Sequence, residues 1–284
     1  MYKIMNNKFN ILFIIVLSLF YGELRSQNME CIPVKSVDEQ TLPFKSGEYL
    51  SYVIKYKWGA VNTEIGEASF SIQSSGTGSD SYYIGKLSGG TAKFYDMFFK
   101  AREYYEAKFS KENLKPIYFH RDVKEGKYSV KNWIDFLPGN KIKSKVQKNN
   151  RSPKDTLLQG RDCSFDVVSL FYFVRSLDSS VLFNNAERSI SIVIDGEIYN
   201  LGFRFAKREN KRIPGMGLRK TLKFSAKVIK GQFFAGDEQL HIWVSDDSNR
   251  VPLYFESPVK VGRISGRLSK YSNLKYYNNI QNLY

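Results

Sequence analysis

Histidine and cysteine are scarce in this sequence, and their scarcity narrows the chemistry that the chain can perform. The 284 residues include two His and two Cys. Zinc sites draw mainly on Cys and His at close spacing, and no such group occurs. His120 and His241 lie in alternating stretches, opposite to the large aliphatic side chains, so both are predicted to face solvent. The Gly-x-Ser-x-Gly pattern of many serine hydrolases is also missing. We therefore predict no cofactor, no metal and no catalytic residue, and favour a protein that is not an enzyme.

Long apolar runs are missing as well, except at the start of the chain. Residues 9–21 are mostly apolar, two lysines precede them, and a polar stretch that includes Ser26 follows. This layout is typical of a signal peptide, and the run is too short to span a bilayer comfortably. We predict a signal peptide over residues 1–26 and a single exported β-rich domain over residues 27–284. A membrane anchor that stays in place is the alternative.

The segment before Cys31 argues against a lipid anchor at that cysteine. Lipid attachment requires small apolar residues directly before the cysteine, whereas Asn28, Met29 and Glu30 stand there. No later stretch has the apolar length of a transmembrane helix. We expect the protein in the periplasm or associated with the outer membrane, in an oligomeric state that the sequence leaves open.

The chain is strongly basic. Its formal charge is +15, and removal of residues 1–26 takes away three cations and one anion, which leaves +13. Such an excess attracts anionic partners at long range. Because nucleic acid is not expected outside the cytoplasm, envelope lipids, glycans or envelope proteins are the partners that remain. The simpler interpretation is that lysines cover solvated strand faces and protect sheet edges.

Apolar and polar residues alternate with a period of two along most of the chain. Residues 49–58 place Tyr52, Ile54 and Trp58 on one face, and similar alternation recurs near residues 68–73, 117–123, 128–136, 188–195, 201–205, 222–228 and 239–245. This pattern is typical of half-buried antiparallel strands. Turn-forming residues separate the runs at 124–127, 138–141, 195–197 and 235–238. The sequence therefore predicts an all-β fold, in which a long antiparallel meander forms a barrel-like or two-sheet domain.

Two segments depart from this alternation. Residues 164–177 carry apolar side chains at helical spacing, with Asp162 or Ser164 as the candidate N-cap. Residues 94–101 are a second candidate for a short helix, although their aromatic residues also suit a strand. Cys163 lies just before the first of these helices. In an exported chain, two cysteines indicate a disulfide between Cys31 and Cys163, with two buried free thiols as the alternative.

Residues 242–255, IWVSDDSNRVPLYF, place two adjacent carboxylates near a guanidinium group. Both flanks alternate, and Asp246 to Asn249 are residues that favour turns. We predict a hairpin in which Asn249 takes the left-handed conformation and Arg250 forms an exposed ion pair across the bend. A catalytic acid pair is the less favoured interpretation.

Three stretches of the chain share features with a known family: residues 44–72, 163–177 and 231–268. The matching points are Gly47-Glu48, Trp58-Gly59, Gly66-Glu67-Ala68, Asp166, Ser169, Tyr172, Arg175, the Trp243–Pro252 hairpin and Gly262. They resemble the exported bacterial family catalogued as domain of unknown function 3108, and most of all its members from the Bacteroidetes. The resemblance implies a barrel-like antiparallel fold in the cell envelope and supports the disulfide. It implies no activity, because none is established for the family.

Three functions stay open at this point. The first is a non-catalytic envelope protein that binds or carries an anionic amphiphilic lipid or glycan, with contacts from Arg204, Lys207, Arg208 and Arg212. The second is an enzyme acting on envelope glycans or lipids through Glu48, Glu67, Asp166 or Asp247. The third is an outer-membrane β-barrel, because the alternation up to the terminal Tyr284 is similar to the end of such barrels.

Overall fold

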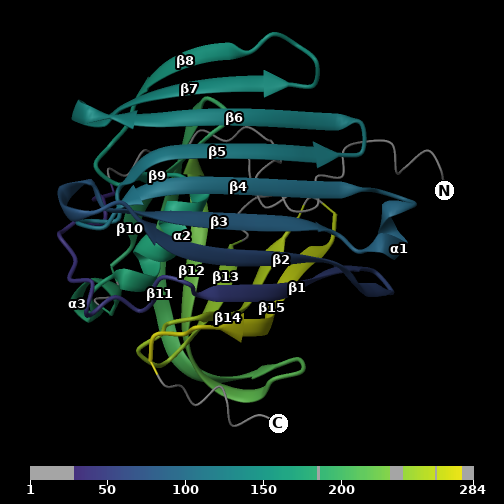
Figure 1. Cartoon of the computed structure of the whole chain (residues 1–284). Coiled ribbons are helices and arrows are strands. Elements are labelled where there is room, and N and C mark those ends of the chain that lie inside the picture. The colour runs from purple at the N-terminus through teal and green to yellow at the C-terminus, as the bar shows by residue number, and fades with distance from the viewer. Residues whose placement is uncertain (1–28, 184–185, 231–238, 260, 277–284) are drawn as a thin grey trace.

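The computed structural model describes residues 29–183, 186–230, 239–259 and 261–276 (Figure 1). The predicted signal peptide, the predicted turn at 235–238 and Tyr284 lie outside these residues. Within the described part of the chain, no helix is long and apolar enough to cross a bilayer.

In the described part of the chain, fifteen strands form one sheet. The first eight are β1 (Tyr49–Trp58), β2 (Val61–Ser75), β3 (Tyr82–Thr91), β4 (Ala101–Ser110), β5 (Pro116–Glu125), β6 (Tyr128–Leu137), β7 (Lys141–Lys148) and β8 (Lys154–Gln159). The others are β9 (Ser164–Phe165), β10 (Arg188–Ile194), β11 (Glu197–Ile213), β12 (Gly217–Lys230), β13 (Leu240–Ser245), β14 (Pro252–Pro258) and β15 (Arg263–Ser272). The predicted all-β meander is confirmed.

The sheet consists of two meanders that join in its middle. Its order runs from β8 down to β1, continues with β15, and then runs down to β9. Neighbouring strands are antiparallel, apart from the short parallel pair β9 and β10. Figure 1 shows β1–β8 in front and the green-to-yellow strands behind, with a helix between them. The first and last of the described strands are neighbours, because β1 pairs with β15.

The two edges of the sheet are close together in the chain. β8 ends at Gln159 and β9 begins at Ser164. The amide of Gly160 donates to the carbonyl of Asn140 (2.8 Å), which holds the start of this link against the β6–β7 connection. Four residues thus carry the chain from one edge strand to the other, so the sheet must curve back on itself there. This curvature gives the barrel-like shape.

Among the described residues, three α-helices interrupt the strands: α1 (Lys93–Asp96), α2 (Val167–Ser176) and α3 (Ser179–Leu182). The predicted helix at 164–177 begins later than expected, because Ser164 and Phe165 form β9. Its N-cap is Asp166, not Asp162 or Ser164. The Asp166 carboxylate accepts from the amides of Val168 (2.8 Å) and Ser169 (2.9 Å), which are amides that the helix itself leaves without partners. The predicted helix at 94–101 is correct only in its first half, since Ala101 begins β4.

Helix α2 fills the space enclosed by the sheet. Tyr172 is buried against Phe109 and Phe44, and Phe171 stacks on Phe70 of β2 with ring centroids 3.9 Å apart. Burying a side chain of this size contributes roughly 1.5–3 kcal/mol. Gly85 of β3 allows the close approach, because a Cβ there would lie 2.8 Å from a methyl group of Val168. The interior is therefore packed around α2.

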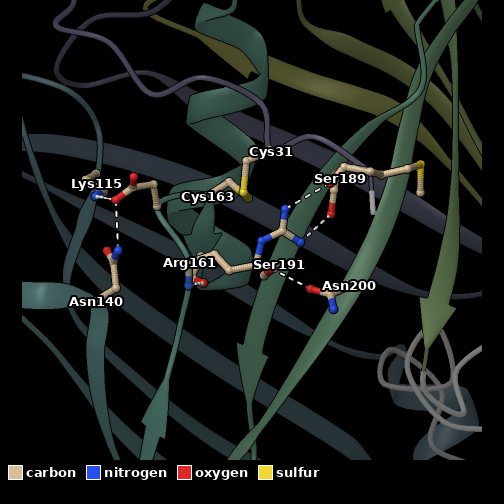
Figure 2. The surroundings of a disulfide bond; sticks show 11 residues. Cys31, Lys115, Asn140, Arg161, Cys163, Ser189, Ser191 and Asn200 are labelled. Atoms are coloured by element: carbon tan, nitrogen blue, oxygen red, sulfur yellow. Dashed lines mark hydrogen bonds and ion pairs between the residues drawn. A yellow bond between two sulfur atoms is a disulfide. The ribbon is translucent and has the colours of Figure 1, made fainter. Parts of the chain in front are cut away.

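The N-terminal arm is fixed to the sheet by the predicted disulfide, which is present (Figure 2). Cys31 lies beside Ser189 of β10, and the Cys163 carbonyl accepts from the amide of Ser191 (2.9 Å). The Arg161 guanidinium donates to the Ser189 hydroxyl (3.0 Å) and to the carbonyl of Met29 (3.3 Å). The arm and β9 together cover the free edge of β10, which protects that edge from pairing with another chain.

Candidate functional site

A groove of about 630 Å³ crosses the outer face of β14, β15 and β1. Residues opposite each other in neighbouring strands share a face, and Tyr254, Arg267 and Val53 form one such row. Tyr52 and Ile54, which alternate with Val53, belong to a buried core cluster. The row therefore points outward. Pro214, next to the end of β11, and the β1–β2 turn border the groove on two sides.

Four cations line the groove: Lys55, Lys57, Arg263 and Arg267. Glu64 neutralises part of this charge, since it pairs with Lys55 (3.5 Å) and Arg267 (3.3 Å). Lys57 and Arg263 differ, because they lie directly opposite each other across β1 and β15. Among the described residues, no ion pair includes either of them. Like charges at opposed strand positions destabilise the sheet, so an anion between these two side chains would relieve their repulsion.

Trp58 extends the groove at the end of β1. Its side chain is 54% exposed, although alternation predicts it on the buried face with Ile54. The turn after β14 packs closely against this strand end, because the Tyr56 hydroxyl donates to the Val261 carbonyl (2.8 Å). Gly262 has φ +88°, and a Cβ there would lie 2.4 Å from the Lys57 carbonyl. The contact requires glycine and places Arg263 beside Lys57.

The four predicted contact residues do not converge on one surface. Arg204 and Lys207 oppose Ser225 and Lys223 and share a face, whereas Arg208 and Arg212 oppose Leu222 and Leu218 on the other. A β-bulge between Phe205 and Lys207 causes this split, because one extra residue reverses the alternation. Arg204 lines a separate pocket of about 190 Å³. Arg208 lies over the ring of Phe183 and pairs with Asp246 (3.4 Å).

The four carboxylates proposed for an enzyme are also dispersed. Asp166 caps α2 in the interior, and burial raises its pKa to about 6. Glu67 lies exposed on β2. Glu48 is buried and binds the Arg175 guanidinium through both oxygens, at 2.6 and 3.0 Å. Arg175 also donates to the carbonyl of Asn249 (3.0 Å). These contacts hold α2 in place and leave neither Glu48 nor Asp166 on a substrate-accessible surface.

The 246–250 segment is a turn, as predicted, but two of its details are different. Asp247 accepts from the amides of Asn249 (3.0 Å) and Arg250 (3.1 Å), which shapes the turn. Arg250, and not Asn249, has positive φ (46°). The Arg250 guanidinium donates to the carbonyls of Arg175 and Leu177 instead of forming the expected exposed ion pair. It thereby caps the C-terminal end of α2, so the turn anchors the helix.

A second buried polar cluster lies under β4, β5 and the β10–β11 turn. It contains the buried Glu103, Arg121 and Glu125 and the partly buried Asp195, with 3.5 Å between Arg121 and Asp195. Burial and then the charge of Glu103 raise the pKa of Glu125 to about 9. The amide of Asp195 donates to the Asn132 side chain (2.9 Å), which fixes this turn against β6. The cluster joins the two halves of the sheet.

The family described as "Protein of unknown function (DUF3108)" matches residues 51–269. The chain belongs to this family. The DUF3108 match begins in β1 and ends in β15, so it includes both strands that supply Lys57 and Arg263. Among curated proteins, no match was found.

One similar solved structure is described as "Crystal Structure of Beta-barrel-like Protein of Domain of Unknown Function DUF1849 from Brucella abortus". It has 8% identity and a TM-score of 0.54, and the likeness covers 81% of this DUF3108 chain and 99% of that one. At this identity the likeness concerns the fold alone. It agrees with the barrel-like curvature of the sheet.

Sequence patterns miss the groove for an identifiable reason. Lys57 and Arg263 are separated by almost the whole sheet in sequence and become neighbours only because β1 pairs with β15. The resemblance to the family already pointed to Trp58-Gly59 and Gly262, which lie at this end of the groove. These matching residues were the one feature of the sequence that pointed to this end of the groove.

Proposed function

We propose that the protein is an exported, non-catalytic component of the cell envelope that binds an acidic glycan in the outer groove. The opposed, unpaired charges of Lys57 and Arg263 carry this proposal, because an anionic group between them would remove a repulsion that the free protein contains. Within the groove, four cations and Glu256 stand beside the exposed Trp58 ring, and Glu64 adds one more acid at the side.

The groove suits a glycan better than a lipid chain. It is open and lined by charged side chains, and Trp58 offers a flat apolar surface on which a sugar ring can stack. The enclosed side of the sheet is occupied by α2 and its aromatic contacts. The predicted signal peptide and the disulfide support export, since disulfides persist in oxidising compartments.

Calorimetric titration of the purified mature protein tests this proposal. The probes are polygalacturonate oligomers, which are acidic, and maltodextrins of the same length, which are neutral. The wild-type protein should bind only the acidic oligomer, and more weakly as salt increases. The double variant Lys57→Gln/Arg263→Gln should lose at least about tenfold in affinity, which corresponds to about 1.4 kcal/mol.

A matched control is the double variant Arg204→Gln/Lys207→Gln. It removes the same charge from the same side of the sheet but outside the groove, and should keep nearly all of the affinity. Equal losses in the two variants would reduce the binding to general attraction by a basic protein and would contradict a site in the groove.

A further inference from the structure

A second exposed surface lies at the end of the sheet where α1 stands. Phe94, Met97 and Phe98 of this segment are 63%, 74% and 62% exposed. They are not needed to hold α1, because that helix is tied to the sheet by polar contacts. The Tyr95 hydroxyl bonds to Thr63 of β2, and Asp96 binds Thr91 and Arg102. The three apolar side chains therefore project from a firmly held support.

The neighbouring turn adds to this apolar surface. Trp58 and Val61 oppose each other at the β1–β2 turn, and both are exposed. The Thr63–Tyr95 bond places this turn at the same end of the sheet as α1, as Figure 1 shows. Phe94 and Phe98 lie together, with ring centroids 5.9 Å apart, and exposed apolar side chains that gather in this way are typical of an interaction surface.

Lysines surround the apolar group. Lys93 and Lys100 flank α1, and Lys127 lies in the β5–β6 turn, where the amide of Gly126 donates to the Lys100 carbonyl (2.9 Å). All three are exposed, and in the described part of the chain no ion pair includes them. The acid of α1, Asp96, is already neutralised by Arg102 (2.6 Å). The surface therefore presents unpaired positive charge around projecting apolar side chains.

We propose that this α1 surface docks the protein on an anionic lipid bilayer, with Phe94, Met97 and Phe98 inserted at the level of the head groups and Lys93, Lys100 and Lys127 on the lipid phosphates. Aromatic and apolar side chains partition into the interfacial region, and nearby lysines attract anionic lipid. This charge complementarity favours a bilayer over an apolar protein partner, which would leave the lysines unpaired. Trp58 borders both this surface and the groove, but Phe94, Met97, Phe98 and the three lysines lie outside the groove, so the inference does not rest on glycan binding.

Vesicle sedimentation tests the proposal. The mature protein is mixed with vesicles of phosphatidylethanolamine and phosphatidylglycerol, or with vesicles of phosphatidylcholine. It should sediment with the anionic vesicles and stay mostly in solution with the neutral ones. The triple variant Phe94→Ser/Met97→Ser/Phe98→Ser should lose sedimentation, and Lys93→Gln/Lys100→Gln should weaken it about fivefold for each lysine removed.

Two variants at the opposite end of the sheet serve as controls. Ile117→Ser/Leu137→Ser removes exposed apolar side chains, and Lys141→Gln removes an exposed lysine. Both should bind as the wild type does, and circular dichroism should show that every variant is folded. Equal binding by the α1 variants and the controls would overturn the proposal. So would a lipid-free dimer, measured by light scattering, that separates in the triple variant, because it would assign the α1 surface to a second copy of the chain.

Discussion

Arg175 and Arg263 show two uses of the same side chain on the two sides of one sheet. Arg175 is buried on the inner side, where its guanidinium donates to the Glu48 carboxylate and to the backbone carbonyls of Pro43 and Asn249. Arg263 is exposed on the outer side and faces Lys57. A buried charge must be compensated within the protein because desolvation is costly. An exposed charge stays hydrated, so it can remain without a partner until a ligand binds. Substitutions inside should therefore change stability, and substitutions in the groove should change binding.

The disulfide is expected to give the largest effect on the inner side. Cys163→Ser opens a loop with a sequence separation of 132 residues, so the chain-entropy model predicts a loss of up to roughly 4–5 kcal/mol. Urea unfolding in oxidising buffer measures it. Arg263→Gln is the matched outer variant and should stay within about 0.5 kcal/mol of the wild type. Similar losses of unfolding free energy in the two variants would contradict the view that inner residues determine stability and groove residues do not.

The buried ion pair should give the next largest effect. Glu48→Gln leaves the Arg175 charge without its counterion and is expected to cost about 3–5 kcal/mol. The double variant Glu48→Gln/Arg175→Met removes the uncompensated charge and should recover part of this loss. Thermal unfolding of the three proteins provides the comparison. A loss below about 1 kcal/mol in Glu48→Gln would show that the pair is not needed to compensate Arg175.

The buried carboxyl group of Asp166 should make the stability of the protein depend on pH. Its pKa in the folded protein is raised from 3.8 to about 6 by burial. The folded protein therefore holds this proton more tightly than the unfolded chain does. The resulting stabilisation is fully present below about pH 4 and is lost as the pH rises through 6. Relative to Asp166→Asn, which does not titrate, the wild type should lose about 3 kcal/mol over this interval. Unfolding at several pH values measures the difference, and a difference independent of pH would contradict the raised pKa.

Sequence patterns predict many strands of this fold but not β3, β4 or β15, and they predict the pairing of the strands poorly. Alternation along residues 49–58 identifies β1, because the polarity of each residue depends only on whether its own side chain faces the core or the solvent. The same alternation fails at Phe205–Lys207, where a bulge reverses the faces and separates Arg204 from Arg208. A bulge depends on how the partner strand fits and leaves no local signal. The N-cap of α2 was missed for a similar reason, since Ser164 is occupied in the pairing of β9 with β10.

The candidate site was less predictable than the fold. Charge alone suggested the cations of β11, which form a conspicuous run in sequence. The groove instead draws its unpaired charges from one residue in β1 and one in β15. Only the pairing of these two strands brings the charges together, and no feature near Lys57 specifies its neighbour across the sheet.

The pairing of β1 with β15 also sets an order of events during synthesis and folding. When a ribosome or a translocation channel delivers the chain from its N-terminus, β1 can pair with β2 at once. Its other edge stays unpaired until residues 263–272 emerge, after all the other described strands. Contacts between such distant segments form slowly, and an unpaired strand edge invites association with other chains in the meantime. A newly delivered molecule therefore passes through a period in which it needs protection from its own copies, and truncation before β15 would make that period permanent.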